Sequence, residues 1–397
     1  MTKWQNRLMA GIHWIGQIQS YMKKAFGASE AISRVRLAPR AIAQSDKFQG
    51  NWSKGNSLRD FVCLFLVGAG LSVAIAACSA TTSAAKPDVK LNLVSFSVTQ
   101  AAHDRIIPKF VEKWKKERGQ NVIFEQSYGG SGTQAEAVIK GSQEADIVHL
   151  ALPLDVNKIQ QAGLIEKNWE SRAPKSSIVT RSVAALVTRQ GNPKGVNTWT
   201  DLTKEGVKVI VANPKTSGIA IWEFLAFWGA VTQTGGDETQ AQTFTTNVYK
   251  NAPVLAPSAR DASELFFQQG KGDVLINYEN EVFLAEQNGQ KLPFVVPNVN
   301  ISIDNPVAIV DKNVEKHGTK EVAEAFVDFL YSTEAQREFA KLGYRPVNPT
   351  ILEEVANKYA PIQTFFTAQD LGGWDLLQNR FFNDGALFDK IWTSSKA

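Results

Sequence analysis

The stretch Gln126-Ser127-Tyr128-Gly129-Gly130-Ser131-Gly132-Thr133-Gln134-Ala135 joins an expected strand, residues 122–126, to an expected helix, residues 135–139. Its three glycines allow a tight turn that exposes backbone N–H groups. Ser131 and Gln134 have the spacing of a capping box, so Ser131 is the predicted N-cap. The first N–H groups of a helix lack internal partners and lie at the positive end of its dipole. The turn is therefore a candidate anion site, although such a motif alone favours an ordinary capped turn.

Two further segments repeat this order of strand, Ser- or Gly-containing turn and helix. A strand over 207–212 leads into Asn213-Pro214-Lys215-Thr216-Ser217-Gly218 and an apolar helix over 219–230. An extended segment over 252–255 leads into Pro257-Ser258-Ala259-Arg260-Asp261 and a helix over 262–269. Such alternation indicates an α/β fold with parallel strands covered by helices. Ligands of these sheets bind at the carboxyl ends of the strands, where all three turns fall.

The rest of the chain from residue 89 onward continues the alternation. Ile106, Phe110 and Trp114 recur at a spacing of four, which predicts an amphipathic helix over 105–118. The other expected elements are strands over 90–96, 145–150, 177–188, 273–278 and 303–311 and one long helix over 320–342.

Basic residues are concentrated at the start of the chain. The whole sequence has 43 Lys and Arg and 39 Asp and Glu, but residues 1–60 hold 10 of the former and 3 of the latter. The remainder is therefore slightly acidic, which argues against nucleic acid as a partner. Residues 1–57 are expected to be an extension without assigned function, or the result of a start codon placed too far upstream.

An export signal is expected over residues 58–78. Phe61–Ala77 is a run of 17 residues without charge, behind Lys54 and Arg59, and it ends in small residues before Cys78. Cys78 stands where a bacterial lipoprotein signal places its lipid-modified cysteine, and residues 79–87 resemble a tether. An uncleaved membrane anchor is the alternative, because 17 residues is at the short end of a membrane span. Either interpretation exports the segment that follows.

The composition of the turns favours an anion that carries no proton. Residues 129–134 and 216–219 contain no acid, so the candidate donors are backbone N–H groups and the hydroxyls of Ser131, Ser217 and Tyr278. A protonated phosphate needs an acceptor as well, whereas sulfate needs donors only. Each charge-assisted hydrogen bond contributes about 1.5–3 kcal/mol, so a handful could support micromolar binding.

No catalytic or metal-binding arrangement is visible in the exported part. Beyond Cys78 the chain has no cysteine, and its three histidines lie far apart in the sequence. Glu279 and Glu281 point apart on either a strand or a helix, with no nucleophile–base pair beside them. We therefore expect a binding protein without cofactor or metal rather than an enzyme.

From about Leu91 to Trp374 the chain resembles the periplasmic sulfate-binding protein of the sulfate ABC transporter family. The stretches that carry the resemblance are QSYGGSGTQA (126–135), ADIVHLALPLDV (145–156), VTRQGNP (187–193), VANPKTSGIAIWEFLAFWG (211–229), KNAPVLAPSAR (250–260), QGKGDVLINYENE (269–281) and LGYRPVNP (342–349). The resemblance implies a two-lobed type II periplasmic-binding-protein fold, with mixed sheets flanked by helices and sulfate held in a hinged cleft. It also implies lobe 1 over 88–178, lobe 2 over 179–281, and a return to lobe 1 with C-terminal helices across both lobes over 282–397.

The resemblance further implies which residues surround the anion. The expected ligand-binding residues are Ser97, Ser131, Ser217, Gly218, Ile219, Ala259 and Tyr278. The expected supporting residues of the turns are Gly129, Gly130, Gly132 and Arg260. Four positions depart from the family: Ser97 replaces an aspartate, Ile219 and Asp261 replace glycines, and Tyr278 replaces a tryptophan whose indole N–H donates to the anion. Asp261 is a candidate cap of the third helix, together with Glu264, and it would then place a carboxylate near the anion unless Arg260 offsets its charge.

The implied function is capture of sulfate outside the cytoplasm and its delivery to the membrane permease of an ABC importer. The protein is expected to be periplasmic, monomeric and free of nucleic acid, with lipid anchoring through Cys78 an option. Thiosulfate, molybdate or another oxyanion remains an alternative ligand because Ser97 and Tyr278 depart from the family. A hydrolase on the same fold is the alternative from another class, and it lacks a visible nucleophile–base pair.

Overall fold

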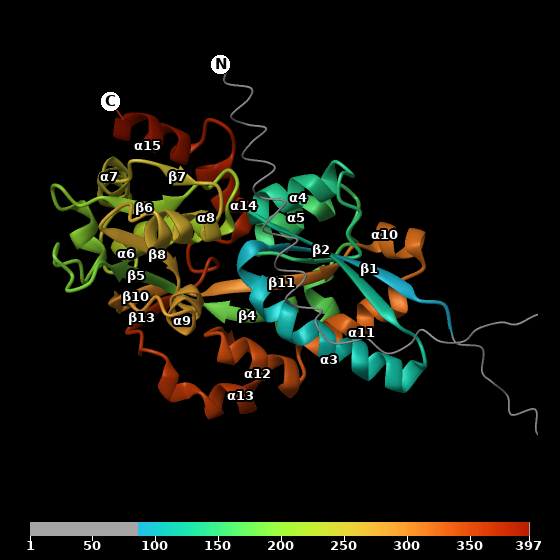
Figure 1. Ribbon diagram of the computed structural model, residues 1–397. Helices are drawn as coiled ribbons and strands as arrows, with labels where there is room; N and C mark the ends of the chain where they lie inside the picture. Colours follow the sequence, from blue (N-terminus) through green and yellow to red (C-terminus); the bar gives the residue numbers. More distant parts are fainter. Residues whose placement is uncertain (1–85, 397) are drawn as a thin grey trace, which may run out of the picture. The chain divides into compact units, whose positions relative to one another are not determined.

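Residues 86–396, the part of the chain that the computed structural model describes, form two lobes, each built on a β-sheet (Figure 1). The sheet of lobe 1 contains β1 (Val89–Phe96), β2 (Val122–Gly129), β3 (Ile147–His149), β4 (Ile178–Ser182), β11 (Ile303–Ile309) and β12 (Arg345–Pro346). Its strand order is β12-β4-β11-β3-β1-β2. β1 is parallel to β2 and β3, while β11 is antiparallel to β3 and β4. The parallel strands β1, β2 and β3 therefore all end at one edge of the sheet.

Helices cover both faces of this sheet. Side chains of its strands alternate between the two faces, and both faces are apolar and must be buried. Leu93 of β1 belongs to the same apolar cluster as Phe110 of α3 (Gln100–Arg118), whereas Val94 clusters with Val138 of α4 (Ser131–Ile139). Figure 1 accordingly shows α3 and α4 on opposite sides of the sheet. The other helices of lobe 1 are α5 (Pro153–Gln161), α10 (Asp311–His317), α11 (Lys320–Leu330), α12 (Thr333–Lys341) and α13 (Pro349–Glu354).

Lobe 2 repeats the arrangement. Its sheet contains β5 (Ala184–Thr188), β6 (Val209–Ala212), β7 (Leu255–Ala256), β8 (Val274–Tyr278) and β9 (Phe294–Val295), in the order β7-β6-β8-β5-β9. β6 is parallel to β7 and β8, so these three strands also end at one edge. Its helices are α6 (Gly218–Thr232), α7 (Glu238–Lys250), α8 (Ala259–Ser263), α9 (Glu279–Gln287) and α15 (Leu387–Lys396). α6 is buried along its first three turns because it is apolar on nearly every side.

Three segments connect the lobes. Val183 is the single residue between β4 of lobe 1 and β5 of lobe 2. After β9 the chain forms β10 (Val299–Ile301), which pairs with β13 (Thr364–Phe366), and then enters β11 of lobe 1. The C-terminal segment passes α14 (Trp374–Leu377) and places α15 against α7. The short remaining turns are 3-10 helices at 97–99, 169–172, 174–177, 199–203 and 356–358 and π-helical turns at 264–268 and 378–382.

The alternation of strands and helices is confirmed, but two elements expected to be continuous are interrupted. The strand expected over 177–188 is β4 and β5, which lie in different sheets because the chain crosses between lobes at Val183. The helix expected over 320–342 is α11 and α12. Ser332 separates them, since its hydroxyl accepts the N–H of Ala335 and caps α12.

The expected lobe boundaries are also displaced. Lobe 1 was expected to end at residue 178, but β4 keeps residues up to Ser182 in its sheet. Lobe 2 was expected to end at residue 281, but Phe294 and Val295 still pair with β5. The first boundary moves because all of β4 pairs with β11, and the second because the chain returns to the lobe 2 sheet as β9 after α9.

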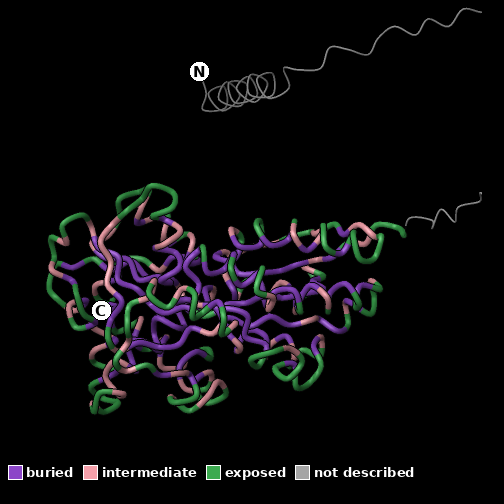
Figure 2. The backbone as a smooth tube through the Cα atoms, turned by 90° about the horizontal axis from the view of Figure 1, so that it is seen from below, coloured by how far each residue is buried: buried purple, intermediate pink, exposed green. Residues whose placement is uncertain are grey.

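Burial follows the two sheets, whose strands are largely buried, while exposed residues gather in the connecting loops (Figure 2). The expected export signal, Cys78 and most of the tether lie outside the described residues. Across residues 86–396, none of the helices combines the length and the apolar character needed to span a bilayer.

Candidate functional site

The three turns singled out in the sequence meet between the lobes. A Cβ placed on Gly130 would overlap the carbonyl oxygen of Thr216 and lie 3.0 Å from that of Pro257. The N–H of Thr133 in lobe 1 donates to Thr216 O in lobe 2 over 3.3 Å, and Thr216 Oγ1 donates to Pro257 O over 2.8 Å. Only a glycine at position 130 allows this approach, because any side chain would collide with the backbone of the other lobe.

Ser131 begins α4 but does not cap it. The N-cap is Gly130, and Gln134 donates instead to Ser95 O over 3.2 Å and to Ser127 Oγ over 3.0 Å, so the predicted capping box is wrong. The Ser131 hydroxyl donates to Asp155 Oδ2 over 2.7 Å and accepts the Ala151 N–H over 3.0 Å. Its hydrogen is therefore committed to a carboxylate, and the group that Ser131 directs outward from the helix end is its backbone N–H.

Asp155 is the acidic residue that sequence reasoning missed. It lies at the third position of α5, is 1% exposed, and also accepts from Lys158 Nζ over 3.1 Å. Its link to Ser131 spans 24 residues, beyond the reach of a local motif. The signal available in the sequence was Pro153, because proline in the first helical turn followed by an acid marks the start of a helix.

The second turn brings the N-terminus of α6 against the first. A Cβ on Gly218 would overlap that of Ala151 and lie 2.7 Å from Leu152 Cδ2 and 3.1 Å from Ser131 Cβ. Ser217 is the N-cap, its N–H donates to Asn213 O, and its hydroxyl makes no cap hydrogen bond. Gly218 and Ile219 are the first two residues of α6, so their N–H groups have no acceptor within the helix.

The third turn places Ala259 at the start of α8. Ser258, not Asp261, is the N-cap: its hydroxyl accepts the Asp261 N–H over 3.2 Å and donates to Asp261 Oδ2 over 2.6 Å. Arg260 does not offset Asp261, because its Nη2 donates to Glu281 Oε1 over 3.2 Å. The predicted cap at Asp261 is wrong, since the serine three residues earlier occupies the N-cap position.

Tyr278 and Ser97 are the two remaining residues that were expected to contact the anion. Tyr278 ends β8 and is 1% exposed, and its hydroxyl has no hydrogen-bond partner in the described part of the chain. Burial, reinforced by nearby Tyr344 and Glu223, raises the pKa of Tyr278 well above its ordinary value, so it remains a donor. Its ring lies 6.0 Å from that of Phe96, the residue before Ser97. Ser97 begins the turn after β1.

The two glutamates that follow Tyr278 each pair with a different arginine. Glu279 accepts from Arg345 Nε and Nη2 over 2.8 and 3.1 Å, and Glu281 accepts from Arg260. Burial raises the pKa of both carboxyl groups, and the arginines partly oppose that shift. These are ion pairs between elements rather than an acid–base pair, and among residues 86–396 no cluster of three potential metal ligands is found.

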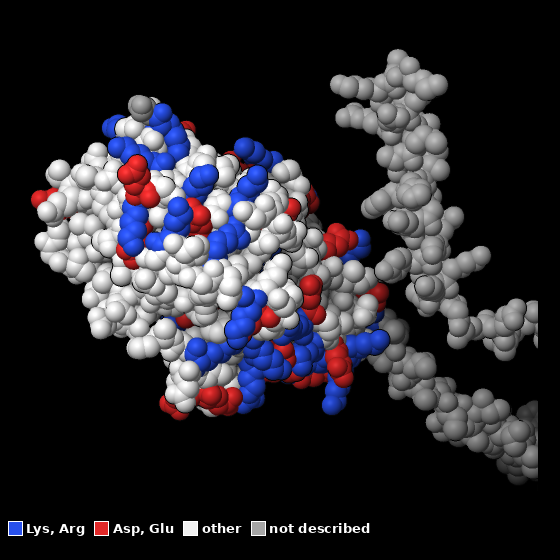
Figure 3. All heavy atoms as spheres, turned by 60° about the vertical axis from the view of Figure 1, so that its left-hand side comes forward, with Lys and Arg blue, Asp and Glu red and all other residues white. Residues whose placement is uncertain are grey.

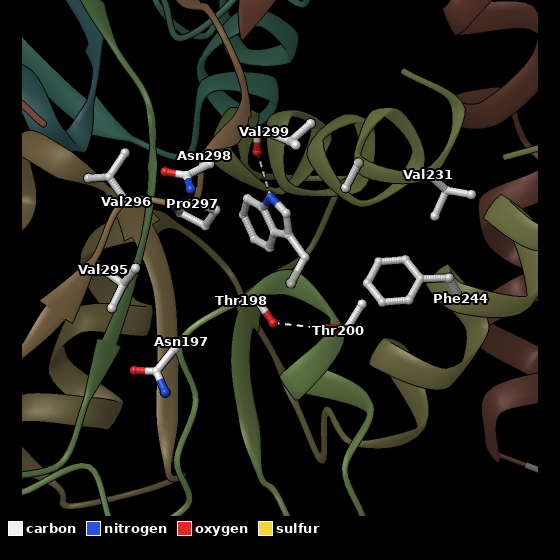
Figure 4. Close-up of a pocket in the computed structure, with 12 residues that line it drawn as sticks. Asn197, Thr198, Thr200, Val231, Phe244, Val295, Val296, Pro297, Asn298 and Val299 are labelled. Atoms are coloured by element: carbon white, nitrogen blue, oxygen red, sulfur yellow. Dashed lines mark hydrogen bonds between the residues drawn. The ribbon is translucent and has the colours of Figure 1, made fainter. Parts of the chain in front are cut away.

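A separate cavity of about 290 Å³ in lobe 2 has a different character (Figure 4). Val231 and Phe244 lie on one side in the close-up and residues 295–299 on the other, and Trp199 also lines the cavity. The Trp199 indole is already committed to Val299 O over 2.7 Å. The cavity is unsuited to a dianion, because apolar side chains dominate its walls.

On the face of the molecule shown in Figure 3, basic and acidic side chains lie interspersed.

Comparison with known proteins agrees with this architecture. The family of bacterial extracellular solute-binding proteins matches residues 91–345. A sulfate-binding protein of Synechococcus elongatus is 53% identical over 337 residues, 82% of this chain and 95% of that protein. A thiosulfate-binding protein of Pseudomonas aeruginosa is 38% identical over 331 residues, 83% of this chain and 97% of that protein. The solved sulfate-binding protein SubI of Mycobacterium tuberculosis superposes with a TM-score of 0.68 at 32% identity, covering 74% of this chain and all of that one (100%).

The chain belongs to the family of bacterial extracellular solute-binding proteins. The expected two-lobed type II periplasmic-binding-protein fold is confirmed by the two mixed sheets and by the superposition on SubI.

Proposed function

We propose that this protein binds sulfate between its lobes and delivers it to an ABC importer. The observation that carries the proposal is the meeting of the α4 and α6 N-termini at Ser131 and Gly218. Each terminus offers N–H groups without intrahelical acceptors and the positive end of a helix dipole. The residues proposed to contact the anion are Ser97, Ser131, Ser217, Gly218, Ile219, Ala259 and Tyr278. The names of the relatives support sulfate as the anion.

The donors have distinct roles in this proposal. Ser97, Ser131, Gly218, Ile219 and Ala259 contribute backbone N–H groups, whereas Ser217 and Tyr278 contribute hydroxyls. Ser217 supplies its hydroxyl because its N–H is already bonded to Asn213 O. Tyr278 replaces the expected indole donor, and its buried hydroxyl lacks another partner among the described residues.

The hydrogen bonds that Asp155 accepts favour sulfate over phosphate as the ligand. A protonated phosphate needs an acceptor, and Asp155 is a carboxylate bonded directly to the first turn through Ser131. Its oxygens already accept from Ser131 and Lys158. Because each oxygen of Asp155 is already engaged by a protein donor, we infer that the site favours a fully ionised dianion over an anion that carries a proton.

Binding would proceed by closure of the lobes about the crossing at Val183 and the β10–β11 segment. Closure excludes water, which strengthens each donor–oxyanion contact because the local dielectric falls. The closed form is what the permease would recognise. We also propose that the protein acts outside the cytoplasm as a monomer, without catalysis, and that Cys78 carries a lipid anchor.

The proposal is tested by titration calorimetry of the purified protein with sulfate, thiosulfate, molybdate and phosphate. Sulfate should bind in the micromolar range or tighter, and phosphate at least about 100-fold more weakly, a difference of about 2.8 kcal/mol. Equal affinity for sulfate and phosphate would overturn the donor-only site. Preference for thiosulfate would keep the site but change the substrate, which the tyrosine at position 278 and the Pseudomonas relative make the second candidate.

A further inference from the structure

One main-chain carbonyl links the two lobes directly behind the anion site. Ala151 follows β3, and its carbonyl oxygen accepts two hydrogen bonds of 2.9 Å each. One donor is Asn305 Nδ2 on β11 of lobe 1, and the other is Trp222 Nε1 on α6 of lobe 2. A carbonyl oxygen has two lone pairs, so both bonds form without competition.

The same residue also holds the first turn. The Ala151 N–H donates to Ser131 Oγ over 3.0 Å, so the main chain of residue 151 lies between Trp222 and the start of α4. Gly218, one turn before Trp222, packs against Ala151 and Leu152. The indole therefore fixes the start of α6 against the segment that contacts Ser131.

The two donors differ in what happens when the lobes separate. Asn305 belongs to lobe 1, is fully buried, and is itself held by Thr180 Oγ1 over 3.1 Å. It keeps Ala151 satisfied in an open form. The Trp222 indole is 1% exposed and packs edge-on against Trp374 at 5.0 Å. Its N–H loses its acceptor on opening, so the bond stabilises only the closed form.

We propose that Trp222 is a positioning residue for anion retention: its indole N–H latches α6 to Ala151 in the closed form without touching the anion. This inference rests on the proposed function. It predicts that Trp222 governs the dissociation rate, because the bond exists after closure and not during encounter.

The test compares Trp222→Phe with Trp228→Phe in the purified protein. Trp228 is a matched control: it lies on the same helix, is 4% exposed, and stacks on Phe224 within lobe 2. Trp222→Phe should raise the sulfate dissociation rate about five- to tenfold in stopped-flow measurements, with little change in the association rate, as loss of one hydrogen bond requires. Trp228→Phe should leave the dissociation rate within twofold.

A second measurement on the wild-type protein covers the case in which Trp222→Phe does not fold. Hydrogen exchange at the Trp222 indole, followed by NMR, should slow at least about tenfold when sulfate is added. Equal exchange with and without sulfate, or an unchanged dissociation rate in Trp222→Phe, would overturn the latch. Failure of the wild-type protein to bind sulfate at all would instead refute the proposed function.

Discussion

The hydroxyl of Ser131 donates its hydrogen to Asp155, with Oγ 2.7 Å from Oδ2. This bond joins the first turn of α4 to the first turn of α5 and leaves the N–H of Ser131, rather than its hydroxyl, for an anion. Ser131→Ala should therefore act mainly on stability. Removing the donor leaves a buried carboxylate oxygen unpaired, which should lower the free energy of unfolding by about 1–3 kcal/mol in urea titrations.

A matched control for that substitution is Ser142→Ala. Its hydroxyl donates to Ala137 O over 3.1 Å, but the residue is exposed. That variant should change the free energy of unfolding by less than about 0.5 kcal/mol. An undiminished stability of Ser131→Ala would show that the bond to Asp155 contributes nothing to the fold.

Gly218→Ala should act on closure instead. The added methyl group would overlap Ala151 Cβ across the two lobes, so the closed form becomes strained, while a separated pair of lobes would accommodate it. Sulfate affinity should fall at least about 100-fold by calorimetry, equivalent to about 2.8 kcal/mol. The unfolding free energy without sulfate should change by less than about 1 kcal/mol, because alanine is a better helix former than glycine.

Gly129→Ala provides the contrast within the turns. A Cβ there would meet Gln134 Cδ at 3.5 Å, an ordinary contact within lobe 1. Its effect on sulfate affinity should be much smaller than that of Gly218→Ala. Comparable losses in the two variants would mean that the cross-lobe overlap at Gly218 does not limit closure.

The three turns could be predicted because each is a local pattern in which strand, Ser/Gly turn and helix follow one another within a short stretch. Their meeting is a long-range property: Gly130 and Pro257 are brought together by two separate sheets. The bond between Ser131 and Asp155 is also long-range, and no local sequence motif predicts it. Capping was misjudged at Ser131 and Asp261 because a neighbouring residue, Gly130 or Ser258, occupies the position that fits the backbone.

The crossing at Val183 shows another limit of pattern reading. Residues 178–188 are apolar enough for one buried strand, and the lobe in which each half pairs depends on contacts with β11 and β8. The break between α11 and α12 was easier to predict from the sequence, since Ser332 offered an N-cap signal inside the expected helix. Trp222 lies in the apolar helix expected over 219–230. It is buried there, but its N–H reaches the other lobe.

Tyr278→Phe should separate binding from folding. The hydroxyl has no partner within residues 86–396, so its removal should leave the unfolding free energy unchanged or raise it. If the hydroxyl donates to the dianion, sulfate affinity should fall about 10- to 100-fold by calorimetry. Tyr331→Phe is the control, because its buried hydroxyl also lacks a described partner but lies between α11 and α12. Equal affinity of Tyr278→Phe and wild type would exclude the phenol from the site.

Glu223 should give the fold a characteristic pH dependence. It lies on α6, is fully buried, and its one hydrogen bond among the described residues is from the Ala212 N–H to Oε2 over 3.2 Å. Burial without a cation raises its pKa well above the ordinary value of 4.5, with the Ala212 N–H opposing the shift. Above that ordinary value the unfolded chain releases this proton while the folded chain keeps it, so this group makes stability fall as pH rises.

Glu223→Gln removes the titration while keeping the shape of the side chain. Relative to the wild type, its free energy of unfolding should rise progressively as the pH is raised above about 4.5, and the pH dependence of the difference should vanish below that value. Urea titrations from pH 4 to pH 9 measure the difference, and Glu136→Gln on the exposed face of α4 serves as the control. A constant difference across this range would show that Glu223 ionises in the folded protein as it does in the unfolded chain, despite its burial on α6.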